Sequence, residues 1–85
     1  MREYIGNDNY GKLKQNYIDK ISKMTDEELY AETRSKIWLS AYASNNRRSD
    51  YHWHVDALYD EWTDNRSNPS GYDKAYKDEY RANFG

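Results

Sequence analysis

Both histidines of the chain lie in the segment 50–62, close to several carboxylates, so metal or acid–base chemistry would be sought there first. His52, Asp56 and Asp60 stand at i, i+4 and i+8, and a helix places them on one face. They would span about 12 Å at the rise of an α-helix, which is too far for one ion to touch all three. A site of His52 and Asp56 would need further ligands. We therefore expect a solvated polar face, with no metal and no cofactor.

A hydrolytic interpretation would use His52 or His54 as the general base, with Ser44 or Ser49 as the nucleophile. The sequence contains no nucleophile elbow, no glycine-rich phosphate loop and no paired metal-ligand motif. His54 stands at the edge of an apolar stripe, where a histidine is usually packed with one nitrogen satisfied. We expect no catalytic residues, and a protein that is not an enzyme.

Trp53 carries the strongest signal for binding. On a helical wheel it falls among Asp56, Asp60 and Asp64, away from the expected core face. Two interpretations stay open. Trp53 packs against the last helix or the N-terminal lead, or it contacts a partner, because Trp, Tyr and Arg dominate interface hot spots.

Arg47 and Arg48 precede this helix in a polar loop. They are either solvated charges or contacts for acidic groups or phosphates. The helix that follows is acidic, which suits a basic groove on a partner and disfavours a long polyanion. The sequence therefore predicts a partner-binding surface centred on the third helix, made of Arg47, Arg48, His52, Trp53, Asp56 and Asp60.

The composition predicts a single folded domain over residues 1–85. Leu, Ile, Val and Phe together number only ten, but ten Tyr and three Trp supply the missing apolar area. The net charge of −2 is too small to hold the chain open. It also argues against sequence-specific nucleic-acid binding, because such domains are usually basic.

The sequence gives no sign of export or membrane insertion. It has no cysteine, and residues 1–9 are polar and contain glycine, unlike a signal peptide. The longest apolar run, residues 37–43, is far shorter than the roughly 20 residues that span a bilayer. We expect a cytoplasmic protein without membrane contact.

Four helical segments are expected to position these residues, giving an all-α, compact bundle of three to four short helices. After an irregular lead at 1–9, apolar spacing predicts helices at about 10–24, 26–44, 50–64 and 71–82. Thr25 and Glu28 form a capping box that starts the second helix, and Ser49 or Asp50 caps the third.

The last helix carries aromatic residues at four-residue steps: Tyr72, Tyr76, Tyr80 and Phe84. The stripe is most simply core, and the alternative is an adhesive surface, since Tyr gives a large contact area at low entropic cost. Whether this helix packs in its own chain or swaps onto a neighbour stays open, and a homo-oligomer is one alternative.

Residues 35–62 resemble small uncharacterised helical proteins of tailed bacteriophages. The resemblance rests on three runs of aromatic and polar residues: Trp38-Leu39-Ser40-Ala41-Tyr42-Ala43, 48–53 and 56–62. It implies a phage genome and supplies no catalytic residues. By analogy, such proteins bind a bacterial host or defence protein, as anti-CRISPR inhibitors do. The alternatives are a sponge-type protein that binds a nucleotide or small ligand through Arg47, Arg48 and aromatic stacking, and a virion or assembly component.

Overall fold

The computed structural model describes residues 4–84, and it confirms an all-α bundle. The described residues form four α-helices and one short π-helical segment, and only an isolated bridge between Asn7 and Leu13 has β geometry. The elements follow one another in the order α1 (Lys14–Ser22), α2 (Asp26–Tyr42), α3 (Asp50–Asp60), η1 (Glu61–Asn65) and α4 (Pro69–Phe84).

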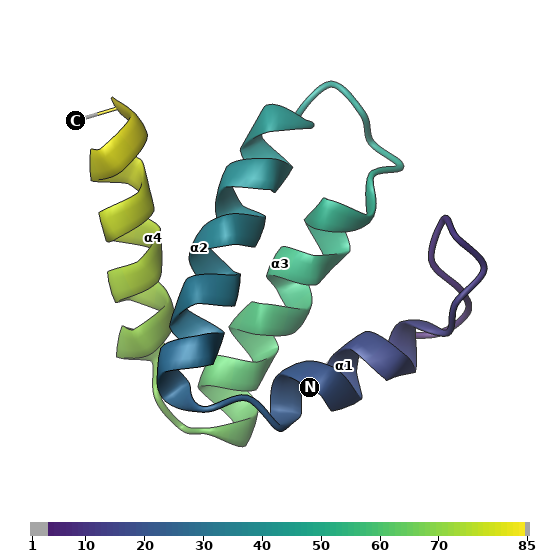
Figure 1. Cartoon of the computed structure of the whole chain (residues 1–85), viewed down its shortest axis with the longest axis horizontal. Coiled ribbons are helices and arrows are strands. Elements are labelled where there is room, and N and C mark those ends of the chain that lie inside the picture. Colours follow the sequence, from purple (N-terminus) through teal and green to yellow (C-terminus); the bar gives the residue numbers. More distant parts are fainter. Residues whose placement is uncertain (1–3, 85) are drawn as a thin grey trace.

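The helices α4, α2 and α3 lie side by side, and α1 crosses the end of this layer beside α3 (Figure 1). The molecule is accordingly flat, with extents of 36 × 31 × 18 Å. The helix α2 lies in the middle and contacts both α3 and α4. Its buried residues, Leu29 and Thr33, belong to its first half, whereas Trp38 and Tyr42 in the apolar second half are exposed. Both α2 and α4 run in the same direction, and α3 runs against them (Figure 1).

The start of α2 is the element that local sequence determines most clearly. The Thr25 hydroxyl accepts a hydrogen bond from the Glu28 amide at 3.1 Å, and the Glu28 carboxylate accepts one from the Thr25 amide at 2.9 Å. The predicted capping box is therefore confirmed. At α3 the Ser49 hydroxyl accepts from the Tyr51 amide at 3.3 Å, which confirms Ser49 as the cap.

The first helix is shorter than predicted: it begins at Lys14, four residues after the expected start. The Asp8 carboxylate accepts hydrogen bonds from the amides of Tyr10 and Lys12, both at 2.9 Å, and so closes a turn. Gly11 takes a positive φ of 80°, which a helix cannot contain. The Asp8 side chain gives the amides of Tyr10 and Lys12 an alternative to helix formation, and residues 8–12 form the turn.

The core is small and ringed by aromatic side chains. Its buried cluster consists of Ile21, Leu29, Ala57, Leu58 and Trp62, and partly buried rings pack against it. The hydroxyl of Thr33 accepts a hydrogen bond from the Trp62 indole at 3.0 Å and donates one to the Leu29 carbonyl at 2.6 Å. A polar contact therefore fixes the largest side chain of the core.

The third helix was predicted to run to residue 64, but it changes to a π-helix at Glu61. The amide of Arg66 donates to the carbonyl of Glu61, five residues back, at 3.0 Å. This wide turn buries both Glu61 and Trp62. Segments of this kind are rare and usually occur as single turns within α-helices.

Arg66 ties the π-helical segment to the first two helices. Its guanidinium forms ion pairs with Glu61 at 2.8 Å and Asp26 at 2.7 Å. It also donates to the carbonyls of Ile21 and Met24, at 3.1 and 2.7 Å, just where α1 ends. One side chain thus satisfies the end of α1, the start of α2 and the buried Glu61.

The fourth helix is fixed at its beginning and middle. Gly71 lies directly against the Trp62 ring, and Ala75 is fully buried. Further along, Tyr30 of α2 donates to Asp78, and Arg34 pairs with Glu79 at 2.9 Å. Beyond these contacts α4 diverges from α2 (Figure 1).

Candidate functional site

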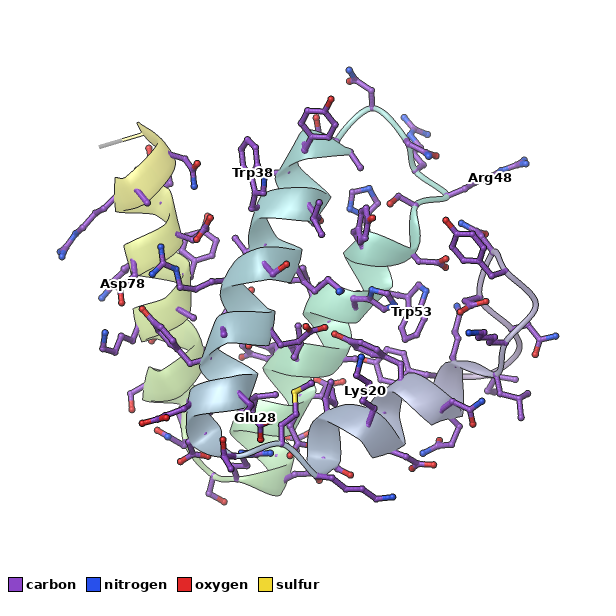
Figure 2. All side chains as sticks on the ribbon, in the orientation of Figure 1. Lys20, Glu28, Trp38, Arg48, Trp53 and Asp78 are labelled. Atoms are coloured by element: carbon purple, nitrogen blue, oxygen red, sulfur yellow. The ribbon has the colours of Figure 1, made fainter. Side chains whose placement is uncertain are left out.

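Five of the six residues predicted to bind a partner line one shallow pocket at the start of α3. The pocket has a volume of about 330 Å³, and its predicted members are Arg47, Arg48, His52, Trp53 and Asp56. Lys14 and Asp50 line it too, so the pocket carries charges of both signs. Arg48 points away from the helices, whereas Trp53 lies between α3 and the N-terminal part of the chain (Figure 2).

Asp60, the sixth predicted residue, is not at this surface. Its side chain is buried, and it accepts a hydrogen bond from the Tyr4 hydroxyl at 2.7 Å. The wheel placed Asp60 on a solvated face because it could not show that the N-terminal lead covers that face. The prediction for Asp60 is wrong, since a partner has no access to it.

Trp53 packs against other parts of the chain, which is the first of the two interpretations that stayed open for it. Its ring meets the rings of Tyr4 and Tyr17, with centroids 6.0 and 5.5 Å apart, and Lys14 places its ammonium 5.2 Å from the ring. The indole nitrogen donates to Asp50 at 2.8 Å. Trp53 therefore holds α1 and the lead against α3.

His52 joins the end of α2 to the start of α3. Its Nε2 lies 3.2 Å from the Ala43 carbonyl and 2.9 Å from that of Asn46, and its Nδ1 lies 2.7 Å from the Ser40 hydroxyl. Carbonyls only accept, so Nε2 carries the proton and Nδ1 accepts from Ser40. Both ring nitrogens are therefore engaged, which leaves no lone pair for a metal or a base role.

The described residues contain no group of three His, Asp or Glu side chains placed to hold a metal ion. Arg47 and Arg48 are exposed, and neither forms an ion pair within residues 4–84. Asp56 is exposed on the same side. Of the predicted residues, these three are the ones a partner could reach directly.

His54, the other histidine, is stacked among rings. Its ring centroid lies 4.1 Å from that of Tyr17 and 4.3 Å from that of Trp53, and its buried Nδ1 has no hydrogen-bond partner among the described residues. Burial, and to a lesser extent the Lys36 ammonium, lower the pKa of His54 to about 4. The imidazole is therefore neutral at pH 7.

This lowered pKa predicts a stability change in mild acid. The unfolded histidine binds a proton below about pH 6.5, and the folded one only near pH 4, so the free energy of unfolding falls as the pH drops through this window. After allowance for solvent screening, we expect a loss of about 1 kcal/mol between pH 7 and 5. Urea unfolding of the wild type and of His54→Phe measures it. The variant keeps a ring and should lose less, whereas equal losses would contradict the assignment.

Sequence reasoning missed a second surface, an apolar groove between α2 and α4 with α3 at its base. It has a volume of about 300 Å³. Trp38 projects into the space between the two helices (Figure 2). The groove is lined by Ile37, Trp38, Ser40, Ala41, Val55, Tyr72, Tyr76, Glu79, Tyr80 and Asn83.

The tyrosine stripe of α4 was the signal that could have found this groove. Its core interpretation is wrong for Tyr76 and Tyr80, which are 49% and 56% exposed, while Tyr72 is half-buried. The side chain of Phe84 lies outside the described residues. Trp38, on the opposite wall, is 41% exposed. The alternative of an adhesive tyrosine surface therefore fits the geometry better.

No family model, curated protein or solved structure matches the chain. Among residues 4–84, no helix combines the length and the apolar character that a membrane crossing requires.

Proposed function

We propose that this chain is a non-enzymatic protein that binds another protein through the groove between α2 and α4. The observation that carries the proposal is the pairing of exposed aromatic walls with an almost uncharged lining. Glu79 is the one charged residue among the lining residues, and it is paired with Arg34. Such a surface gains most by covering an apolar side chain of a partner.

The shape of the groove suits an anchor residue. Trp38 of α2 and Tyr76 of α4 line it together with Val55 of α3, and its α2 side also includes the small residues Ser40 and Ala41. Large apolar anchors seated in pockets carry most of the energy of protein interfaces. A volume of about 300 Å³ accommodates one such side chain with part of a second.

We propose a bacterial host or defence protein as the partner, bound in the cytoplasm of the host cell and modulated or inhibited by the binding. The resemblance of residues 35–62 to phage proteins supports this choice. The groove supports the mode of binding and is independent of that resemblance.

The test starts with a tagged protein in nuclease-treated bacterial lysate and continues with the captured partner in purified form. Trp38→Ala combined with Tyr76→Ala should weaken binding at least about 30-fold, because truncated hot spots cost 2 kcal/mol or more. Arg47→Ala with Arg48→Ala is the matched control and should change the dissociation constant only a few-fold. Full affinity in the groove variant, with its fold intact by circular dichroism, would refute the proposal.

The nucleotide alternative has one observation in its favour, because Lys14, Arg47 and Arg48 line the same pocket as Trp53. Two features oppose it. Asp50 and Asp56 line that pocket too, and a base could stack on Trp53 only by displacing its present neighbours. A ligand at 100 times its dissociation constant adds about 2.7 kcal/mol to stability. An unchanged melting temperature across a nucleotide panel would exclude this alternative.

A further inference from the structure

A further pocket lies between the N-terminal lead and the start of α3, and it shares Asn9, Ser49 and Asp50 with the pocket of Arg47 and Arg48. Its volume is about 280 Å³, and its charged and aromatic walls are formed by Asp8, Tyr10, Asp50, Tyr51 and His54. We propose that this pocket binds a guanidinium or ammonium group, either the side chain of a partner's arginine or lysine or a free amine. The proposal is independent of the groove, with which this pocket shares no residue.

The walls of the pocket are held in place by hydrogen bonds. The Asp8 turn fixes the lead, as described above, and the Asn9 amide donates to the Asp50 carboxylate at 3.1 Å. The Asn9 side chain donates to the Arg48 carbonyl at 2.7 Å. The lead is thus attached to α3 at this point, so the pocket exists before a ligand arrives and little ordering is needed on binding.

The charge of the lining favours a cation. Asp8 and Asp50 contribute two carboxylates, and no lysine or arginine lines the pocket. The internal hydrogen bonds to Asp8 use its Oδ1, and its Oδ2 accepts none from the described residues. An N–H donor of a cationic group bound at this oxygen would form a charge-assisted hydrogen bond.

The cationic side chains around this pocket lie outside its lining. Lys36 lies 5.9 Å from the Tyr51 ring and is paired with Glu32 at 3.1 Å. Lys14, Arg47 and Arg48 line the adjoining pocket, to which Asp50 also contributes. His54 is neutral at pH 7 because its pKa is lowered. The net charge of the lining residues is therefore −2.

The aromatic rings provide the second recognition element. Tyr10 lines the pocket and is 87% exposed, so its ring is accessible to a bound group. Tyr51 lines the pocket as well. Cations are attracted to the faces of such rings, and guanidinium groups also stack on them. Acidic and aromatic walls together distinguish a cationic group from a neutral one of the same shape.

The experiment titrates the full chain with N-acetyl-arginine amide and follows backbone amide shifts by NMR. We expect saturable shifts at residues 8–10 and 49–54, with a dissociation constant on the order of millimolar. The neutral isostere N-acetyl-citrulline amide is the control and should bind several-fold more weakly. A parallel titration with putrescine separates the two sources, since tighter binding of the diamine supports a free amine and tighter binding of the blocked arginine supports a protein side chain.

Three variants test the walls without disturbing the fold. Tyr10→Ala should weaken binding about two- to fivefold, and Tyr10→Phe should retain it. Asp8→Asn keeps the acceptor that closes the turn and removes the charge, so it should weaken binding at least about threefold. Absence of saturable shifts, equal binding of citrulline amide, or unchanged binding to both Tyr10→Ala and Asp8→Asn would each overturn the proposal.

Discussion

Replacing Arg66 with alanine is expected to destabilise the protein by about 3–5 kcal/mol, the usual cost of breaking a buried ion pair from one side. The Glu61 side chain is only 5% exposed, and Arg66 is its charged partner. Without the guanidinium, Asn65 remains as a neutral donor to Glu61, at 2.6 Å. The carbonyls of Ile21 and Met24 lose a donor as well. Small domains have little more stability than this to lose.

Urea unfolding at pH 7 measures the effect, with Arg81→Ala as the control for removing an exposed arginine. The double variant Glu61→Gln with Arg66→Met removes both charges and should recover part of the loss, because no uncompensated carboxylate remains. A loss below about 1 kcal/mol for Arg66→Ala would show that water reaches Glu61 and that the pair behaves as a surface pair.

Gly71→Ala is expected to cost about 1–3 kcal/mol through overpacking, although alanine is the better helix former by about 1 kcal/mol. A methyl group at this position would lie 2.4 Å from Cζ3 and 2.5 Å from Cε3 of Trp62. The Trp62 ring cannot easily yield, because its indole nitrogen is bonded to Thr33 and the guanidinium of Arg66 lies 5.8 Å from its centroid.

Thermal unfolding should show this as a melting temperature lowered by about 4–8 °C per kcal/mol for a domain of this size. Ser70→Ala, one residue earlier on the exposed side of the same turn, should stay within about 0.5 kcal/mol of the wild type. If Gly71→Ala raised the melting temperature, the close approach of α4 to Trp62 would be incorrect.

The parts of the fold that could be predicted depend on interactions between near neighbours in the sequence. The Thr25 capping box and the Ser49 cap involve residues two or three positions apart. The capping box is predicted and confirmed, and Ser49 is one of the two predicted caps, the other being Asp50. The start of α1 was missed because two signals compete there. The apolar spacing from Tyr10 favours a helix, and the Asp8 turn with Gly11 opposes it. The spacing of apolar residues does not show which of these two signals is stronger.

The grouping of predicted residues in one pocket also follows from their closeness in sequence. The loop and first turns of α3 bring Arg47, Arg48 and Asp56 to one pocket, as their closeness in sequence suggested. The burial of Asp60 depends on Tyr4, 56 residues away, and the packing of Trp53 depends on Tyr4 and Tyr17. A helical wheel contains no information about contacts at this separation.

The π-helical segment also bears on how the chain tolerates insertions and deletions. A π turn holds about one residue more than an α turn, so residues 61–65 accommodate an extra residue within a continuous helical path. Asp60, Glu61 and Trp62, three consecutive residues where α3 passes into this segment, are all buried. Deleting one residue between Trp62 and Arg66 would remove the wide turn and shift these two side chains relative to each other, so that the Trp62 bond to Thr33 and the Arg66 bonds to the carbonyls at the end of α1 could not both be kept. A deletion in the 44–48 loop would leave the contacts of Trp62 and Arg66 in place, so we expect length variation in related chains to occur in that loop and not in the π segment.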